Sequence, residues 1–486
     1  APPDGVVQTF GPVHGAGGLV KSDAGSVRLQ SANVYAGPTL VQAGTLYVAD
    51  SAALGSVADG TAVAPGAALA LADAGVNTLT IKEPVTFAGT GPDGLGALRN
   101  DSVAQQQTAF QRLTLSGDAT IGGTAATPLI PFENGKGSFN LRNGTLDLAG
   151  HTLTKAGPGA FLLSYSRLLN AAPGAAVDVA GGALGLDYTA DLGGSSAQTL
   201  TVRTGANLDL YRVYVPQSWT LALEDGAHFS ARSSTSLAEN VWEGPVSLLG
   251  GQALLGGGGS GTIAGPVSGP GGLVKSRGTT YLLNPENTYA GTTTVTNGVL
   301  YAAAAGSLPD PSPAKLNVRQ NGALVVRYAD DTATWPLAWG AADVDVIATT
   351  AIFTQSSAAL GFDPYYADAT YDGDLSGFGL SKYGGNTQTL TGAVNAPGHL
   401  RVYDGALVLA GGTYNLLGTS SLYPGNTGST ASLGTLSITG DTQVIGTDTG
   451  YKKPVTWVSP GHVANSRGVL NIRDNEEHQQ AMRTHG

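Results

Sequence analysis

The sequence predicts an all-β protein: a right-handed parallel β-helix (β-solenoid) that forms an elongated rod. Glycine supplies 72 of the 486 residues, which leaves few uninterrupted stretches where a helix is stable. A short unit recurs along the chain, in which Gly and a small residue precede alternating apolar positions. Such alternation is the period of a strand with one buried face. Clear neighbouring copies lie 22 to 24 residues apart, which is enough for one solenoid coil of two or three short strands.

Within each coil, strands should pair with the equivalent strands one turn above and below, about 4.8 Å away, so that every backbone group finds a partner. The glycines and the Asn-Gly pairs are expected at the corners, where a positive φ is needed, and Gly298 is expected to be such a corner. Copies of the unit begin at Gly44, Gly66, Gly144, Gly182, Gly205, Gly298, Gly322, Gly405, Gly434 and Gly468.

A longer motif occurs twice at one fixed offset. Residues 17–22 (Gly-Gly-Leu-Val-Lys-Ser), 33–37 (Asn-Val-Tyr-Ala-Gly) and 44–47 (Gly-Thr-Leu-Tyr) each have a counterpart 254 positions later, at 271–276, 287–291 and 298–301. Two weaker copies keep only the Leu-x-Lys core, at 153–155 and 380–382. A match of this length without gaps indicates a true internal repeat.

The two strong copies, 17–48 and 271–301, resemble the autotransporter-associated β-strand repeat of bacterial surface β-helices. Ser-Pro-Gly at 459–461, followed by the strand-like 468–472, is also similar to a late-passenger pattern. The resemblance implies a β-helix that is secreted and displayed on a bacterial cell surface. The absence of cysteine suits a chain that crosses an oxidising compartment unfolded.

Charge and hydropathy exclude several partners. The net charge of −11 offers no basic footprint for nucleic acid or anionic lipid, so neither is expected to bind. No apolar run approaches 18 residues, so no transmembrane helix is expected.

Four segments are expected along the chain. They are an N-terminal leader or cap (1–16), a solenoid segment with the first strong repeat (17–250), a second with the other strong repeat (251–472), and a polar C-terminal tail (473–486). The glycine-rich stretch 250–261 marks the boundary between the two solenoid segments, although tight-turned coils would have the same composition.

The densest acidic and aromatic stretch is 363–374, which provides the candidate site. Four carboxylates are candidates for binding Ca²⁺, or for acid and base roles on a glycan: Asp363, Asp368, Asp372 and Asp374. Three aromatic rings are candidates for stacking on sugars: Tyr365, Tyr366 and Tyr371. The spacing fits no EF-hand loop, and a polar loop whose tyrosines pack on the rod explains the same residues. Apart from this Ca²⁺, no cofactor is expected.

No other part of the sequence indicates chemistry. The seven histidines lack metal-ligand spacing, and no nucleophile motif occurs. Trp219 and Trp242 are expected to fill the core. Asp343 and Asp345 alternate with valines and are expected on the outward face of a strand.

The sequence therefore predicts a secreted or surface-exposed structural or adhesive β-helix of a bacterial cell envelope, without enzymatic activity, whose ligand is a surface glycan or protein. One alternative is a subunit that polymerises head to tail into an extracellular filament, because the strand-like 6–10 can add to an open solenoid edge. The other alternative is a glycan-degrading β-helix enzyme, which needs carboxylates or basic residues on one face of adjacent coils.

Overall fold

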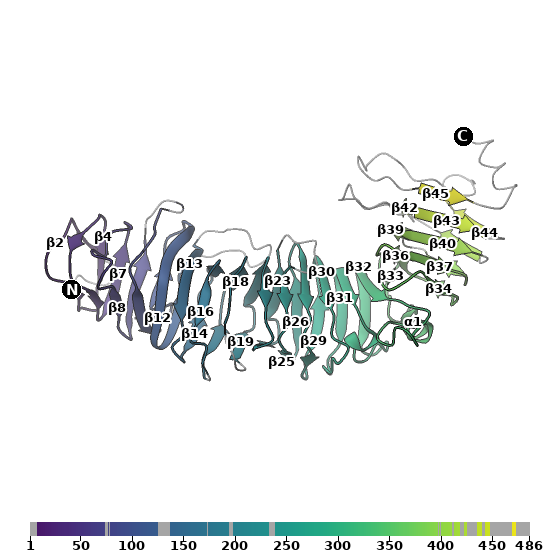
Figure 1. Cartoon of the computed structure of the whole chain (residues 1–486), viewed down its shortest axis with the longest axis horizontal. Coiled ribbons are helices and arrows are strands. Elements are labelled where there is room, and N and C mark those ends of the chain that lie inside the picture. Colours follow the sequence, from purple (N-terminus) through teal and green to yellow (C-terminus); the bar gives the residue numbers. More distant parts are fainter. Residues whose placement is uncertain are drawn as a thin grey trace. The chain divides into compact units, whose positions relative to one another are not determined.

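The computed structural model confirms the fold class: about 49% of the chain is strand, 3% is helix, and the strands form a parallel β-solenoid of about 17 turns (Figure 1). It describes residues 7–410 except 73–75, 77, 125–136, 173, 194–197, 233–238, 397 and 399, together with the strands 413–417, 422–424, 435–439, 443–447 and 469–472. The chain divides into two compact units, Ala1–Gly272 and Leu273–Gly486.

The first unit contains only strands in its described part. They are β1 (Val7–Phe10), β2 (His14–Gly15), β3 (Leu19–Lys21), β4 (Ser26–Leu29), β5 (Val34–Tyr35), β6 (Thr39–Val41), β7 (Gly44–Val48), β8 (Thr61–Val63), β9 (Ala67–Leu71), β10 (Val85–Gly89), β11 (Leu98–Asn100), β12 (Gln106–Gly122), β13 (Phe139–Asp147), β14 (Thr152–Lys155), β15 (Ala160–Ser164), β16 (Arg167–Leu169), β17 (Ala176–Val179), β18 (Ala183–Asp187), β19 (Gln198–Val202), β20 (Asn207–Tyr211), β21 (Tyr214–Val215), β22 (Trp219–Leu223), β23 (His228–Ala231), β24 (Val241–Trp242), β25 (Val246–Leu248), β26 (Gln252–Gly256), β27 (Ser260–Ile263) and β28 (Val267–Ser268).

The second unit adds two short helical segments to its strands. Its elements are β29 (Gly272–Lys275), which begins at the last residue of the first unit, β30 (Thr279–Leu282), β31 (Thr293–Ala302), the 3₁₀ turn η1 (Ala305–Ser307), β32 (Leu316–Arg327), α1 (Ala341–Ile347), β33 (Ala359–Asp363), β34 (Ala369–Tyr371), β35 (Leu375–Ser376), β36 (Gly379–Lys382), β37 (Thr387–Leu390), β38 (Val394–Asn395), β39 (Leu400–Val402), β40 (Ala406–Ala410), β41 (Thr413–Leu417), β42 (Leu422–Pro424), β43 (Thr435–Thr439), β44 (Gln443–Thr447) and β45 (Val469–Ile472).

Equivalent strands of successive coils pair in parallel and in register. β15 pairs with β18, and β18 pairs with β20, which places Phe161, Leu184 and Leu208 in one column across three coils. All three side chains are buried. The alternating apolar positions of the repeat unit therefore build a continuous core inside the coils, as the sequence period predicts.

The Asn and Tyr side chains of the Asn-x-Tyr motif form hydrogen bonds between neighbouring loops. The Asn287 amide donates to the Ser307 carbonyl oxygen at 2.9 Å, and the buried Tyr289 hydroxyl lies 2.6 Å from Thr293 Oγ1. The earlier copy repeats this arrangement, because the Asn33 amide donates to the Ala53 carbonyl and the Tyr35 hydroxyl contacts Thr39 Oγ1. These polar residues recur at the fixed offset because each copy satisfies the same buried backbone groups.

The lysine of the Leu-x-Lys core is buried at a corner of its coil in all four copies. Lys155 Nζ donates to the carbonyl oxygens of Ala156, Gly157 and Gly181 at 2.7, 3.2 and 3.1 Å, and Lys382 makes three equivalent bonds at 2.6 to 3.1 Å. Lys21 and Lys275 also donate to carbonyls of the following turn. A lysine recurs here because an ammonium has three donors to offer to inward-facing carbonyls.

Six of the eight predicted corner glycines that the structure describes have the expected positive φ, whereas Gly144 and Gly322 do not. Gly44 and Gly298, equivalent in the two repeats, have φ values of 65° and 74°. At the Asn-Gly pair 143–144 the asparagine has the positive φ, 52°. Gly144 is needed there for close packing, because a Cβ would lie 2.1 Å from the Gln111 carbonyl oxygen. The glycine-rich stretch 250–261 also belongs to coils, since β26 and the start of β27 lie within it.

One coil of the second unit has a long connection between β32 and β33, residues 328–358, which we call the long excursion. Val299 lies opposite Ala323, but Ala323 lies opposite Ala359, so this coil is about 12 residues longer than its predecessor. The excursion includes α1, so the predicted strand at 343–347 is wrong. Val344 and Ile347 are buried, three positions apart on one helix face, whereas Asp343 and Asp345 are exposed as expected.

The two ends of the sequence are described only in part. β1 pairs in parallel with β4, so residues 7–10 of the predicted leader belong to the first coil. β45 pairs with β43, which places the predicted strand 469–472 in the solenoid. The Ser-Pro-Gly segment at 459–461 and the tail at 473–486 lie outside the described residues.

Candidate functional site

The four aspartates of the 363–374 segment lie in different environments. Asp368 Oδ1 accepts from the Thr387 amide at 2.7 Å, and Asp374 Oδ1 accepts from the Ala393 amide at 2.8 Å, so each fixes the backbone of the next coil. Asp372 is exposed. In the part of the chain that the structure describes, no group of three or more acidic or histidine side chains is arranged to hold a metal ion. The aspartates named as Ca²⁺ candidates therefore do not converge on one point.

Asp363 is the buried member of this set. It ends β33, is 4% exposed, and its Oδ1 has no hydrogen-bond partner among the described residues. Burial raises the pKa of the Asp363 carboxyl to about 6, although the nearby Lys382 ammonium acts in the opposite direction. Asp363 therefore faces the lysine corner inside the coil and is not presented to a ligand.

Tyr371 belongs to the core. Its ring is 1% exposed and contacts Phe362 and Tyr328 at centroid distances of 5.5 and 5.8 Å. The Tyr371 hydroxyl donates to Asp345 Oδ1 of α1 at 2.7 Å. The prediction that this ring stacks on a sugar is therefore wrong, because its faces are already packed and its hydroxyl anchors the helix.

Tyr365 and Tyr366 form an exposed group with residues that the sequence did not single out. Tyr366 stacks on Trp335 with centroids 4.6 Å apart and an interplanar angle of 12°, and Tyr365 stands edge-on to Tyr366 at 5.2 Å. The guanidinium of Arg327 lies 4.0 Å from the centre of the Tyr365 ring. We call Arg327, Trp335, Tyr365 and Tyr366 the aromatic cluster.

The aromatic cluster is open to solvent and held rigidly. Tyr365 is 53% exposed and Trp335 is 37% exposed. The Asn386 amide of the following coil donates to the carbonyl oxygens of Pro364 and Tyr365 at 2.9 and 3.2 Å, which fixes the loop that carries the tyrosines. Flat rings held in fixed positions at the surface can stack on apolar faces of a ligand at little entropic cost.

Carboxylates around the aromatic cluster are used to hold backbone. Asp330 Oδ2 accepts from the Thr370 amide at 2.8 Å, Asp331 Oδ1 from the Thr334 amide at 3.1 Å, and Asp343 Oδ2 from the Gly340 amide at 2.9 Å. Hydrogen bonds donated to a carboxylate favour its ionised form. The backbone and side-chain hydrogen bonds that Thr334 donates hold the pKa of Asp331 below its usual value. These aspartates shape the loop beneath the rings.

Trp219 and Trp242 lie in the core, as predicted. Trp219 and Trp242 are fully buried, and Trp219 Nε1 donates to the Gly193 carbonyl at 3.1 Å. Neither ring reaches a surface where it can meet a ligand.

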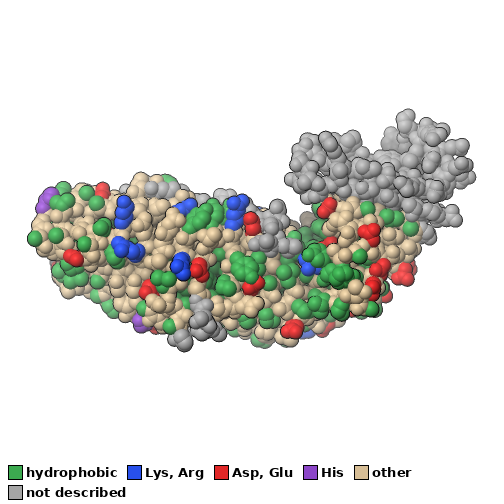
Figure 2. Space-filling view, viewed as in Figure 1, with side chains coloured by type: hydrophobic (Ala, Val, Ile, Leu, Met, Phe, Trp, Pro, Cys, Tyr) green, Lys and Arg blue, Asp and Glu red, His purple; other side chains and the backbone are tan. Residues whose placement is uncertain are grey.

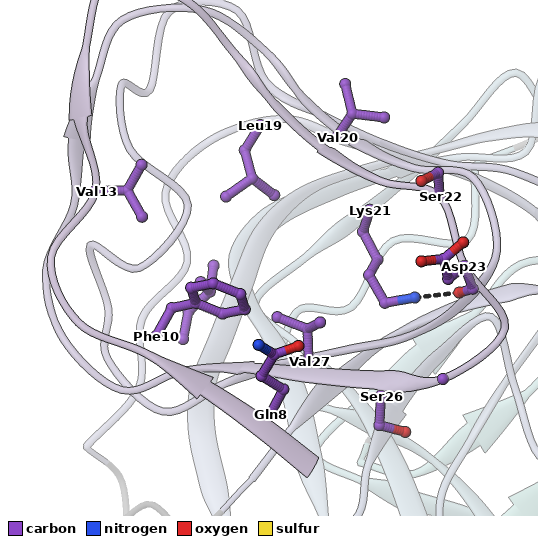
Figure 3. A pocket seen from close by; sticks show the side chains of 12 residues that line it. Gln8, Phe10, Val13, Leu19, Val20, Lys21, Ser22, Asp23, Ser26 and Val27 are labelled. Atoms are coloured by element: carbon purple, nitrogen blue, oxygen red, sulfur yellow. Dashed lines mark hydrogen bonds between the residues drawn. The ribbon is translucent and has the colours of Figure 1, made fainter. Parts of the chain in front are cut away.

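A hollow of about 890 Å³ lies at the first coil, where the inside of the solenoid opens at β1 (Figure 3). Phe10, Leu19 and Val27 line it together with Lys21 and Asp23. Within the described residues no strand pairs with the other edge of β1. Among the described residues, the apolar inner layer and the backbone groups of this coil are therefore open on one side.

Comparison with known proteins identifies the repeat. Residues 19–48 and 277–302 match the family described as passenger-associated-transport-repeat. Neither the curated proteins nor the solved structures contain a significant match to the chain. No helix in the described residues is long and apolar enough to cross a membrane. In its repeats and its parallel β-solenoid, the chain is similar to the passengers of autotransporters, as the sequence resemblance predicts.

Proposed function

We propose that this autotransporter passenger-like β-solenoid is a surface-displayed adhesive protein that binds glycans, without cleaving them, at the aromatic cluster of its second unit. The passenger repeat is typical of secreted or surface proteins, which supports display outside the cell. The observation that carries the binding role is the exposed stack of Trp335 and Tyr366 beside Tyr365. Sugar rings present apolar faces that pack on such flat surfaces.

The hydrogen bonds of the nearby carboxylates support binding without cleavage. Glycosidases place two carboxyl groups on either side of the scissile bond and leave both free to exchange protons or attack. Beside the aromatic cluster, Asp330, Asp331 and Asp368 each accept a backbone hydrogen bond. A carboxylate engaged in this way is held as a structural acceptor.

The test is to screen the full chain on an array of neutral glycans and to measure the affinity of the best ligand by calorimetry. Tyr365→Ala and Trp335→Ala should each weaken binding about tenfold, as expected for the loss of one stacked ring. Tyr214→Ala is the matched control, because Tyr214 is equally exposed, at 53%, and lies in the first unit. If no array glycan binds, or if the control weakens binding as much as Tyr365→Ala does, the proposal is wrong.

A second candidate function is head-to-tail association, favoured by the unpaired outer edge of β1 among the described strands and the hollow beside it. Parallel strands add to such an edge by backbone hydrogen bonding. Light scattering of the full chain over a concentration series should show growing particle mass. Phe10→Lys, which places a charge in the apolar opening, should suppress that growth. A chain that stays monomeric at every concentration contradicts this function.

A further inference from the structure

The first unit carries a groove of about 690 Å³ whose charged lining is entirely basic. Lys82, Arg112 and Arg167 line it, together with Tyr165 and the amide side chains of Gln111 and Asn143. This is unusual for a chain with a net charge of −11. Figure 2 shows Lys and Arg side chains gathered on one face of the first unit.

The basic side chains come from successive coils. Ile81 lies opposite Phe110, Arg112 lies opposite Thr145, and Thr145 lies opposite Arg167. Arg142, whose guanidinium lies over the Tyr165 ring that lines the groove, adds a fourth cation beside it. Coils repeat about every 4.8 Å, so the cations from Lys82 to Arg167 span about 15 Å, and we call these four side chains the ladder. That repeat is close to the length of one sugar residue in an extended polysaccharide.

Few carboxylates neutralise this ladder. In the described part of the chain, Lys82, Arg112 and Arg142 make no ion pair, and Arg167 meets Asp191 at 3.4 Å with both side chains largely exposed. An exposed pair of this kind contributes little and exchanges readily. Glu83 follows Lys82 and interacts with the Arg112 charge, but it is 2% exposed and accepts a hydrogen bond from Thr61, and burial raises the pKa of its carboxyl to about 7. The groove therefore presents a net positive field to an anionic ligand.

Tyr165 and the backbone prearrange the groove. The Tyr165 ring is 38% exposed and stacks on Tyr188 at 4.3 Å and 11°, and the Arg142 guanidinium lies 5.1 Å from its centre. Arg112 donates to the Lys82 carbonyl at 3.0 Å, which holds its side chain across the coils. The groove thus combines a supported ring, basic side chains of which Arg112 is held in place, and amide groups that can bond hydroxyls.

We infer that this groove binds an anionic polysaccharide whose sugars carry carboxylate or sulfate groups. The Tyr165 ring can stack on a sugar ring, and the amides can bond its hydroxyl groups. The ladder can pair with anionic groups that repeat along the polysaccharide. A nucleic acid would require a much broader basic face, since duplex binding neutralises several phosphates and the rest of this chain is acidic. The site is independent of the aromatic cluster, which lies in the other unit.

Biolayer interferometry of the full chain on immobilised heparin, polygalacturonate, dextran and single-stranded DNA tests this inference. At low salt the chain should bind heparin or polygalacturonate at least tenfold more tightly than dextran or DNA. The difference between the two acidic polymers tells sulfate from carboxylate recognition. Binding should weaken as salt rises, because the contacts are ionic.

Variants distinguish binding at this groove from a general effect of the net charge of the chain. Arg112→Gln and Tyr165→Leu should each weaken binding to the acidic polymer about tenfold, whereas Arg203→Gln, an equal charge change at an exposed arginine of the same unit, should not. Tyr365→Ala should also leave this binding unchanged, so failure here is distinct from failure at the aromatic cluster. Equal binding of dextran that Tyr365→Ala does not weaken, tighter binding of DNA, or equal loss in Arg203→Gln would overturn the inference.

Discussion

The corner at Gly298 allows a quantitative test of the repeat. Its φ of 74° is unfavourable for any residue with a Cβ, which costs about 1 to 2 kcal/mol. A Cβ would also lie 2.3 Å from the Gly278 carbonyl oxygen, which accepts the Val299 amide at 2.8 Å. Relieving that overlap displaces the acceptor and weakens a hydrogen bond between two half-buried residues, worth about 1 kcal/mol more. We therefore expect Gly298→Ala to lower the free energy of unfolding by about 2 to 3 kcal/mol, and Gly298→Val by more.

Gly205 provides the control, because it has the same φ of 74° but no other atom lies within 4 Å of the position that a Cβ would take. Gly205→Ala should cost only the conformational part, about 1 to 2 kcal/mol. Gly44→Ala lies in the same unit as the control and repeats the clash, with its Cβ 2.2 Å from the Gly25 carbonyl oxygen. Urea titration followed by far-ultraviolet circular dichroism measures all three losses. Equal losses in Gly44→Ala and Gly205→Ala would refute the steric argument.

Three further predictions concern buried and exposed polar groups. Burial lowers the pKa of the Lys155 ammonium to about 7. Between pH 7 and pH 10 the unfolded chain therefore binds a proton at this lysine that the folded chain does not. The free energy of unfolding should rise over this range by about 1.4 kcal/mol per pH unit because of Lys155. In urea titrations at several pH values, the free energy of unfolding of Lys155→Met should therefore rise less steeply with pH than that of the wild type. If the two rise equally steeply, the three carbonyls keep the Lys155 ammonium protonated and the prediction is wrong. Tyr289→Phe leaves Thr293 Oγ1 without its partner and should cost about 1 kcal/mol in the same titration; a loss below the error of the measurement contradicts this. Arg203→Ala, at an arginine that is 49% exposed, should change stability by less than about 1 kcal/mol despite its two ion pairs, and a larger loss would contradict the expectation of weak surface pairs.

The fold was predictable because one coil repeats the same chemistry. A corner such as Gly298 and a buried lysine such as Lys155 occupy the same place in every copy, so their spacing is visible in the sequence. The role of the lysine was not visible. Its three acceptors come from the next corner and the next coil, and only the folded backbone brings them together.

The candidate site was predictable only in part. Tyr365 and Tyr366 were identified, but Trp335 and Arg327, which complete the cluster, lie about 30 and 40 residues earlier in the chain. Their contact depends on how the long excursion folds back, and no local pattern encodes that. The burial of Tyr371 had a signal in the sequence that was missed, because Ala369, Thr370 and Tyr371 alternate apolar, polar and aromatic side chains as a half-buried strand does.

The helix α1 shows why short alternation is ambiguous. Val344 and Val346 alternate with aspartates, which fits a strand, but Val344 and Ile347 are three apart, which fits a helix equally well. In the fold, Asp343 accepts a hydrogen bond at the start of the helix and Asp345 accepts one from Tyr371. The local bond at the helix start and the tertiary bond from Tyr371 both favour the helix over the strand.

The long excursion between β32 and β33 has a consequence for engineering. The ladder resumes in register after it, from Ala323 opposite Ala359 through Arg327 opposite Asp363, so the coil tolerates additional chain at this corner without any shift in its neighbours. The excursion has its own buried anchors, Trp339 and Ile347, and Trp339 Nε1 bonds to the Ala302 carbonyl at 3.1 Å. A foreign loop inserted between residues 329 and 338 can therefore be displayed on the scaffold, because Trp339 and Phe353 stay in place to pair with Tyr328 and Val318.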